Sequence, residues 1–444
     1  MIRFYQSLFF SRRFFIVTGA FVLLYLLGYL LGKFIGLINL LFFAFIALSL
    51  VDLLILYVPG KSLSAKRLVP KKLSNGDNNE IRLFVFNNYP FKIFLYLLEE
   101  LPFQFQERNM SFKLSLKPNE ERTLKYTVRP VKRGEYTFGA VNAFANTPLN
   151  LINRRYKFDE DKMVPVYPSF LQMRKYELLA ISNRLSEVGI KKIRRIGHSF
   201  EFEQINEYVR GDDYRSINWN ATARHNHLMV NQYQDERSQN LYCIIDKGRT
   251  MKMPFNGMTL LDYAINSTLV LSNIAIKRHD KAGLVTFSDK ISHFVPPDNR
   301  AMQMFRIQET LYNQRTLYNE SDYSKLYITL KRKINQRSLL ILYTNFETGN
   351  SVKRQLDGFL RLAQQHLLVV VFFENRELNE KAEVSTSSLK GIYQKTIAAK
   401  FSFEKQEIIR ELKNKGIYTI LTYPENLTAN TLNKYLELKA RGLF

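Results

Sequence analysis

The sequence predicts a multidomain membrane protein: a two-helix transmembrane hairpin, an all-β sandwich of the immunoglobulin-like (Ig-like) type, and a doubly wound α/β domain. Three observations predict this arrangement. Two long apolar stretches lie near the N-terminus, a series of short β-like segments follows, and strand-like and helix-like segments alternate from about residue 238. The predicted divisions are 1–60 for the hairpin, 61–168 for the β-sandwich, 169–237 for a connecting segment and 238–444 for the α/β domain.

The predicted hairpin begins with residues 14–32, which contain no charged residue. A helix that spans a bilayer needs about 20 apolar residues, and this stretch has that length. After the single Lys33, residues 34–58 repeat the pattern, interrupted only by Asp52. Because a second apolar span follows at once without a small-residue cleavage site, a hairpin is favoured over a signal peptide. We expect Asp52 to be an interfacial residue near the end of its span.

Basic residues on both sides of the hairpin predict its orientation. They are Arg3, Arg12 and Arg13 before it, and Lys61, Lys66, Arg67, Lys71 and Lys72 after it. By the positive-inside rule, both ends and the large domains lie in the cytoplasm. The lone Cys243 agrees with a reducing compartment. The net charge is +24, and the basic residues are scattered along the chain. We therefore favour binding to the anionic inner leaflet of the bilayer over binding to nucleic acid.

The β-sandwich is predicted from residues 79–165. Short segments rich in Phe, Tyr, Val and Ile are separated by Asn, Pro and Gly turn signals at a spacing of roughly ten residues. This domain shows no catalytic constellation. A spacer or docking module is the expected role.

The α/β domain is predicted from apolar strands that alternate with helical segments. The expected strands are 241–245, 282–287, 291–295, 338–343, 366–373 and 416–421. The expected helices are 259–278, 351–365, 403–415 and 427–441. Strands that are apolar on both faces indicate a mostly parallel sheet covered by helices on both sides. Ligands of such sheets bind at the carboxyl ends of the strands, and Asp246 ends the first strand.

Residues 196–230 form the densest group of charged, aromatic and turn residues in the chain, and this block holds the only tryptophan. Its candidate binding residues are Gly197, Glu201, Phe202, Glu207, Tyr208, Gly211, Asp212, Asp213, Arg215, Trp219 and Arg224. This block resembles the signature of the DUF58 family, which runs directly into a von Willebrand factor A-like (vWA-like) domain. The resemblance takes in the hairpin and the β domain as well. Asn206 and Asn220 depart from it, because the family generally has Arg at the first position and often a basic residue at the second.

The resemblance implies a bacterial inner-membrane protein that has a MoxR-type AAA+ ATPase as its partner. From the residues alone, two interpretations of the block stay open. In the first, arginine–carboxylate pairs and a packed Trp219 ring hold the block against the α/β domain. In the second, the block is a docking or ligand surface. The first is favoured because ion-paired networks recur without catalysis, and no nucleophile with an adjacent base accompanies the carboxylates.

A metal site is the second candidate, because vWA-like domains hold a divalent cation on an Asp-x-Ser-x-Ser loop after the first strand. The corresponding loop here runs from Asp246 to Thr250, and both of these residues retain oxygens. Gly248 offers no side chain, Lys247 and Arg249 add positive charge, and Thr344-Asn345 stands where such domains often carry Asp. We therefore expect a degenerate site with weak Mg²⁺ binding or none.

Other signatures of catalysis are not present in the sequence. No spacing of His and Cys typical of a zinc site occurs, and there is no phosphate-binding glycine loop or serine-hydrolase elbow. The expected function is a membrane-anchored adaptor that mediates protein–protein interaction and is not an enzyme. The alternative is a metal-dependent hydrolase that uses Asp246, Asp212 and Asp213. Nucleic-acid binding driven by net charge is the weakest hypothesis, and it predicts a steep dependence of affinity on salt.

Overall fold

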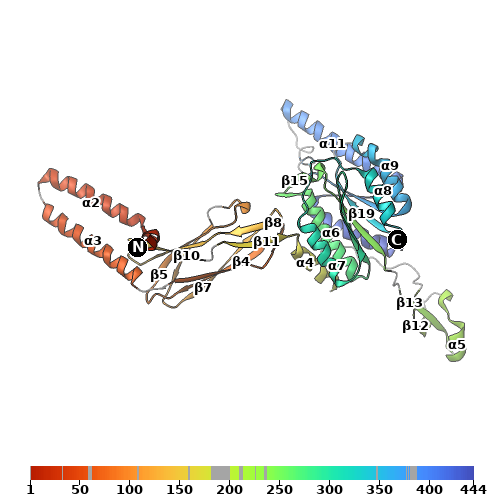
Figure 1. Ribbon diagram of the computed structural model, residues 1–444, viewed down its shortest axis with the longest axis horizontal. Helices are drawn as coiled ribbons and strands as arrows, with labels where there is room; N and C mark the ends of the chain where they lie inside the picture. Colours follow the sequence, from red (N-terminus) through yellow and green to blue (C-terminus); the bar gives the residue numbers. More distant parts are fainter. Residues whose placement is uncertain are drawn as a thin grey trace. The chain divides into compact units, whose positions relative to one another are not determined.

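The protein is described by a computed structural model (Figure 1). It describes residues 2–32, 34–58, 63–107, 110–158, 161–181, 201–209, 214–225, 227–234, 238–346, 349–376, 378, 380 and 388–444. The chain divides into two compact units, Met1–Tyr167 and Pro168–Phe444.

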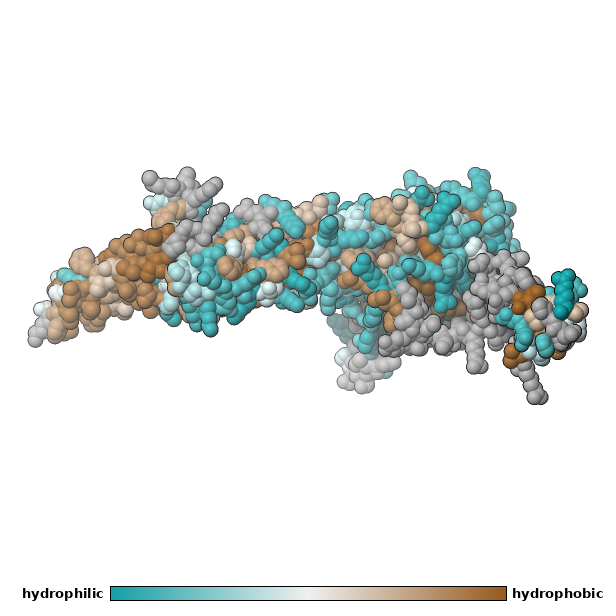
Figure 2. All heavy atoms as spheres, turned by 90° about the horizontal axis from the view of Figure 1, so that it is seen from below, coloured by the Kyte–Doolittle hydropathy of each residue, from teal (hydrophilic) through white to brown (hydrophobic). Residues whose placement is uncertain are grey.

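Two apolar helices form the predicted hairpin in the first unit. They are α2 (Arg12–Leu31) and α3 (Ile35–Tyr57), and both are long and apolar enough to cross a bilayer. Apolar side chains cover the visible face of this hairpin (Figure 2). The Ser11 side chain caps α2 by accepting from the backbone N–H of Phe14, and Gly32 ends the helix in the left-handed region at φ 61°.

The carboxylate of Asp52, which was expected near the membrane interface, joins α3 to the β region. Its Oδ2 accepts from the backbone N–H groups of Leu151 at 3.1 Å and Ile152 at 2.9 Å. Its Oδ1 accepts from the Thr147 hydroxyl, and the Asp52 side chain is fully buried. Near the end of α3, Asp52 and Leu56 are buried, whereas Leu54 and Val58 are exposed.

The chain segment before α2 also joins the β region. The short helix α1 (Ile2–Ser7) leads into strand β1 (Leu8–Phe10), which pairs antiparallel with β10 (Ile152–Phe158). The Ser11 N–H then donates to the carbonyl of Leu151 at 3.0 Å. Both ends of the hairpin are thus hydrogen-bonded to one edge of the β region, and this holds the hairpin and the β region together.

The strands of this region form three sheets. The remaining strands are β2 (Leu63–Leu68), β3 (Leu73–Ser74), β4 (Asn79–Asn87), β5 (Ile93–Glu99), β6 (Met110–Leu116), β7 (Glu121–Val128), β8 (Gly134–Phe138), β9 (Val141–Asn146) and β11 (Lys162–Tyr167). The sheet orders are β1-β10-β9-β5-β6, β2-β4-β7 and β3-β11-β8. Side chains from the first two sheets share one apolar core, as Leu83 and Val85 of β4 cluster with Leu95 and Leu97 of β5. The predicted β-rich region is present; β1, β2 and β3 precede residues 79–165, from which it was predicted, and β1 also precedes the predicted domain, 61–168.

The second unit contains a six-stranded sheet that matches the predicted α/β domain. Its strands are β14 (Asn240–Asp246), β17 (Lys281–Phe287), β18 (Ile291–Asp298), β19 (Leu339–Tyr343), β20 (Leu367–Phe373) and β21 (Tyr418–Thr422), in the order β18-β17-β14-β19-β20-β21. Every neighbouring pair is parallel except β17–β18. The central strands are buried on both faces, and their sequences are therefore continuous apolar runs.

Helices cover both faces of this sheet. They are α4 (Phe170–Ile181), α6 (Leu260–Lys277), α7 (Ala301–Tyr312), α8 (Tyr323–Lys333), α9 (Gly349–Gln365), α11 (Leu389–Asn414) and α12 (Leu427–Ala440). One core contains side chains of α4, α6, α7 and α12, and the other contains side chains of α8, α9 and α11. Successive side chains of β14 point into the two cores alternately: Cys243 lies in the first core and Ile244 in the second. Helices α4, α7 and α8 were not predicted, and α11 begins at Leu389, well before the expected residue 403.

Residues of the predicted signature block form a small hairpin of their own. Strands β12 (Glu201–Glu207) and β13 (Met229–Gln234) pair antiparallel as a two-stranded sheet, separate from the six-stranded one. The short helices η3 (Tyr214–Ser216) and α5 (Trp219–His225) lie between the two strands in the chain.

Candidate functional site

The candidate site lies where the order of the parallel sheet reverses. From β14 the chain builds outward through β17 and β18, then returns to the other side of β14 to form β19. In doubly wound sheets, this reversal leaves a crevice at the carboxyl ends of the two central strands. Asp246 ends β14, and Thr344 directly follows β19, so both side chains lie at this crevice.

Asp246 is almost completely buried, with 1% of its surface exposed, and it is saturated with hydrogen bonds. Its Oδ2 accepts from the Tyr323 hydroxyl at 2.8 Å and from the Thr344 hydroxyl at 2.7 Å. Its Oδ1 accepts from the backbone N–H of Gly248 at 2.7 Å and from the Ser321 hydroxyl. These four donors are all neutral, and they satisfy the carboxylate without a cation.

The Tyr323 hydroxyl is the central donor of this group. Its Oη lies 2.8 Å from Asp246 Oδ2 and 2.6 Å from Thr344 Oγ1. Burial, reinforced by the charge of Asp246, raises the pKa of Tyr323 well above its ordinary value. The phenol therefore stays protonated at any physiological pH and remains a donor to the carboxylate.

The hydrogen bonds around Asp246 compete with a divalent cation for the carboxylate. The hydroxyls of Tyr323, Ser321 and Thr344 all donate to Asp246, so Mg²⁺ would have to displace some of these donors to reach its oxygens. A side chain at position 248 would collide with Ser321 Oγ, so a serine there would require Ser321 to move. Thr250 is half-buried in the short helix η4 (Arg249–Lys252).

Two other titratable groups near this edge have lowered pKa values. Burial lowers the pKa of Lys247, and the nearby Asp289 opposes that shift only in part. Burial, and then the charge of Lys247, lowers the pKa of His293. The His293 Nδ1 lies 3.3 Å from Thr286 Oγ1 and 3.3 Å from Gln314 Nε2. These contacts tie the histidine to its own side of the sheet.

Two cavities open above the carboxyl ends of the strands. A cavity of about 70 Å³ is lined by Asp246, Tyr323 and Asn345 together with the side chains of Arg249 and Arg354. A larger pocket of about 640 Å³ adjoins it and shares Arg249, Thr250, Asn345 and Phe346. The larger pocket extends over the ends of β20 and β21 toward α11.

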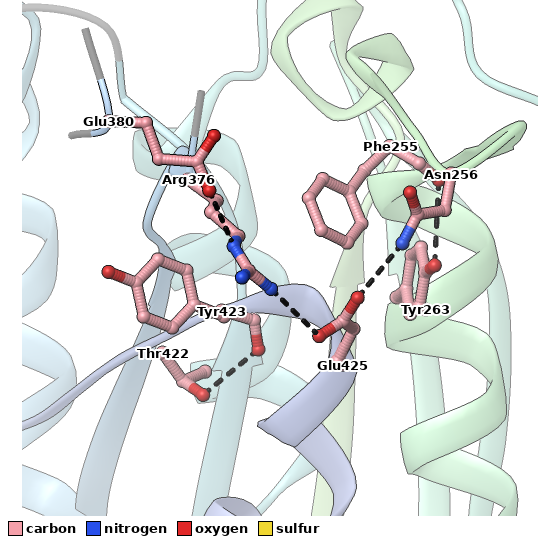
Figure 3. Close-up of polar contacts among 8 residues, drawn as sticks. All are labelled: Phe255, Asn256, Tyr263, Arg376, Glu380, Thr422, Tyr423 and Glu425. Atoms are coloured by element: carbon pink, nitrogen blue, oxygen red, sulfur yellow. Dashed lines mark hydrogen bonds and ion pairs between the residues drawn. The ribbon is translucent and has the colours of Figure 1, made fainter. Parts of the chain in front are cut away.

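Polar contacts connect loops at this edge of the sheet (Figure 3). The Asn256 side chain, in the turn between β15 (Pro254–Phe255) and β16 (Met258–Thr259), donates to Glu425 of η5 (Pro424–Asn426) at 2.9 Å. Arg376 follows β20 and donates to Glu380 at 2.9 Å, and it lies 3.9 Å from the other oxygen of Glu425. Exposed polar contacts thereby link the loops that follow β14, β20 and β21.

The signature block is placed only in part. Gly197, Gly211, Asp212 and Asp213 lie outside the described residues, as do the side chains of Glu201, Phe202 and Arg215. Glu207 and Arg224 are exposed, and Tyr208 is half-buried. Trp219 is 68% exposed, so its ring does not provide the packing that the first interpretation assigned to it.

Tyr323 and Ser321 were not among the predicted site residues. They lie more than seventy positions after Asp246, at the start of the unpredicted helix α8. A signal for this helix exists in the sequence. Asp322 caps it, and Tyr323, Leu326 and Leu330 recur at helical spacing on its buried side.

Comparisons with known proteins connect this site to a family. Residues 204–388 match the family described as "Protein of unknown function DUF58". The uncharacterized protein YeaD of Bacillus subtilis (strain 168) is 28% identical over 222 residues, which are 47% of this chain and 53% of that protein. The match thus spans about half the length of this curated relative. The range that matches the family contains Asp246, Tyr323 and Thr344.

Solved structures show only distant likenesses. The conserved hypothetical protein BatB from Bacteroides thetaiotaomicron is 9% identical, covers 46% of this chain and 99% of its own, and has a TM-score of 0.28. The CARDB domain of the PF1109 protein from Pyrococcus furiosus is 17% identical, covers 23% of this chain and 86% of its own, and has a TM-score of 0.18. At these TM-scores the likenesses carry no argument about fold or function.

Proposed function

We propose that this chain is a membrane-anchored adaptor that presents a protein-binding surface in the cytoplasm of a bacterium. Its partner is a MoxR-type AAA+ ATPase or a client of that ATPase. In this proposal the β region is an Ig-like spacer, and the second unit is a vWA-like domain with a degenerate metal site. The basic residues that flank α2 and α3 favour a cytoplasmic location for both units and an anionic inner leaflet beside them.

The observation that carries the proposal is the saturation of Asp246 by neutral donors. One oxygen of this carboxylate accepts from two side-chain hydroxyls, and the other accepts from a hydroxyl and a backbone N–H. The carboxylate therefore has no lone pair directed at a substrate. It is better suited to hold the loops of a binding surface than to act as a base. This arrangement also speaks against the hydrolase alternative, whose other carboxylates, Asp212 and Asp213, lie outside the described residues.

A second observation supports protein binding. The hairpin of β12 and β13 exposes large apolar side chains: Val209, Tyr214, Trp219 and Leu228 are each 45% to 69% exposed. Aromatic side chains, tryptophan above all, are enriched where protein interfaces derive most of their binding energy. We assign to this hairpin, as part of the proposal, a share of the partner-binding surface.

The test is co-purification of the full chain in detergent with the MoxR-type ATPase of its own organism. Binding that persists in EDTA and falls at least tenfold with Trp219→Ala is the expected result. Phe305→Ala is the matched control, because Phe305 is an exposed aromatic residue on α7 of the same unit. Binding that is lost in EDTA would mean that a metal ion is required. No binding in either condition would overturn the adaptor proposal and bring the hydrolase forward.

A further inference from the structure

The first half of helix α11 carries an exposed row of large apolar side chains. Four of them, at positions 389, 393, 397 and 401, recur every four residues and therefore lie along one broad side of the helix. Two more lie beside this row, and a contiguous apolar surface of this kind marks an interaction site. The six side chains are each 38% to 75% exposed: Leu389, Ile392, Tyr393, Ile397, Phe401 and Phe403.

This half of the helix is held in place from both ends. The Ser388 side chain caps its start by accepting from the backbone N–H of Gly391 at 3.2 Å. The second half packs into the domain through Ile408 and Leu412. Among residues 389–403, all of which are described, only Ala398 is buried, and in Figure 1 one end of α11 projects beyond α8 and α9. The apolar row is therefore already formed and exposed before it meets a ligand.

The same stretch of α11 is basic. Residues 389–403 contain three lysines and no acidic residue. Within the described part of the chain, Lys390 and Lys395 make no ion pair, and Lys400 lies 3.9 Å from Glu404. Lys390 and Lys400 are exposed and lie on the side of the apolar row by helical spacing. Their aliphatic stems can follow the row while the ammonium groups extend past it.

An anionic lipid bilayer matches both properties of this surface. A helix with an apolar side and lysines lies in the plane of the bilayer, with its apolar side at the boundary between headgroups and acyl chains. Lysines near an anionic leaflet are attracted by its negative surface potential. The chain also carries its own link to a bilayer in α2 and α3, and a tethered site meets its ligand at a high effective concentration.

A protein partner matches this surface less well. The side chains that dominate protein interfaces cluster in well-packed pockets. Leu389, Tyr393 and Ile397 line none of the three cavities lined by described residues, namely the two beside Asp246 and one beside Glu99. A projecting helix without a surrounding concave surface suits a flat, fluid ligand such as a bilayer.

We propose that the exposed side of residues 389–403 lies on the anionic surface of the bilayer that holds α2 and α3. Leu389, Tyr393 and Ile397 contact the boundary between headgroups and acyl chains, and the ammonium groups of Lys390 and Lys400 bind lipid phosphates. The contact is shallow, because lysines lie among the apolar side chains, and it therefore depends on anionic lipid. This inference rests on the proposed function only in that the hairpin anchors the chain; it involves neither the ATPase nor a metal ion.

The experiment places a fluorescent label on the row in the full chain, reconstituted in lipid nanodiscs. Tyr393→Cys carries the label, and Ile328→Cys is the matched control, because Ile328 is 49% exposed on α8 of the same unit. The native Cys243 is buried, and burial raises the pKa of its thiol to about 12, so it does not compete for the label. Lipids that carry a nitroxide just below the headgroup quench a label that reaches the bilayer. In nanodiscs that contain phosphatidylglycerol, we expect at least twofold more quenching at position 393 than at position 328. In phosphatidylcholine alone, we expect the two positions to be quenched equally.

Two further changes, each combined with the label at position 393, separate charge from apolar contact. Lys390→Glu/Lys395→Glu is expected to reduce the quenching to the level of the control position. Lys353→Glu/Arg361→Glu makes the same change of charge at exposed positions of α9 and should leave the quenching unaltered. Ile397→Ser alters no charge and is expected to reduce the quenching at least twofold. Thermal unfolding of each variant shows whether it is folded.

Three results would overturn the inference. They are equal quenching at positions 393 and 328 in anionic nanodiscs, equal quenching at position 393 in both lipid compositions, and protection of that label from an aqueous quencher without quenching by lipid. The last result would mean that a protein, such as a second copy of the chain, covers the row. Failure of the membrane anchor gives a different result, because the chain would then separate from the nanodiscs on gel filtration and both proposals would fall. A chain that stays with the nanodiscs without quenching at position 393 refutes only the α11 contact.

Discussion

The Tyr323 hydroxyl donates a 2.8 Å hydrogen bond to Asp246 and lies 2.6 Å from the Thr344 hydroxyl, so a phenol joins the ends of two central strands. Substitution Tyr323→Phe removes this donor and leaves a buried carboxylate with one partner fewer. We expect the free energy of unfolding to fall by about 1–3 kcal/mol. Chemical denaturation of the full chain in detergent measures the change. Tyr327→Phe, one turn later on α8 and half-buried, is the control and should cost less; an equal loss would contradict a special role for Tyr323.

The Asp246 site should be insensitive to divalent cations. Its four neutral donors already satisfy the carboxylate, so a cation would have to displace hydrogen bonds that are in place. We expect the thermal unfolding midpoint of the parent chain to be the same in Mg²⁺ and in EDTA. An upward shift that grows with Mg²⁺ concentration would show that the folded state binds the ion.

Gly248 and Ser321 compete for the same space. A Cβ at position 248 would collide with Ser321 Oγ and lie 3.1 Å from Asp246 Oδ1. Gly248→Ser, which rebuilds the serine of the vWA-like loop, should therefore destabilise the chain by about 1–3 kcal/mol through overpacking. Adding Ser321→Ala should recover part of that loss, because it removes the colliding oxygen. Unfolding midpoints of the two single variants and the double variant test this, and strictly additive losses would refute the competition.

Much of the α/β domain could be predicted from sequence because its central strands are buried on both faces. A continuous apolar run such as Leu241–Ile245 is typical of a strand covered by helices on both sides, and the position of Asp246 follows from the end of that run. The partners of Asp246 could not be predicted in the same way. Tyr323 reaches Asp246 only because α8 begins beside the end of β14, and α8 is a polar helix whose pattern has only three buried positions.

Two other features did not follow from the sequence. Trp219 was expected to pack, but its hairpin is a separate two-stranded sheet and leaves the ring 68% exposed. Asp52 was expected at the membrane interface because it lies near the end of its span. Its hydrogen-bond partners, the backbone N–H groups of Leu151 and Ile152, lie about one hundred residues later in the chain and could not be identified from that position.

Asp52 should be essential to the attachment of α3. Asp52→Leu keeps the apolar character of the helix but leaves the N–H groups of Leu151 and Ile152 and the Thr147 hydroxyl without their acceptor. We expect a loss of about 2–5 kcal/mol, because several buried donors lose one partner together. Urea denaturation of the full chain in detergent measures it. Thr147→Val removes one of the three donors and should cost less; a larger loss for Thr147→Val would contradict this account.

His366 should make stability depend on pH. Its ring is buried, neither nitrogen has a hydrogen-bond partner within the described residues, and burial lowers its pKa. Since the folded pKa lies below the unfolded value of about 6.5, the unfolded chain binds more protons between the two values. This residue's contribution to the free energy of unfolding is therefore fully present above about pH 6.5 and declines as the pH falls toward the folded pKa.

Comparison of the parent chain with His366→Leu at pH 5 and pH 7.5 tests this. The variant should lose less stability on acidification than the parent does. His279→Asn is the control, because His279 is exposed and its positive φ of 63° suits asparagine. Identical pH dependence for the parent and His366→Leu would refute the assignment.

The pairing of β1 with β10 sets an order of events during synthesis. Leu8 pairs with Arg154 and Phe10 with Ile152, so the first strand leaves the ribosome long before its partner exists. At about 5–20 residues per second, the wait is roughly seven to thirty seconds. Helices α2 and α3 are synthesised within that interval, so both exist before β1 can pair with β10. Until residues 152–154 emerge, β1 is an unpaired strand beside an apolar hairpin, and an unpaired strand of this kind can pair with another chain.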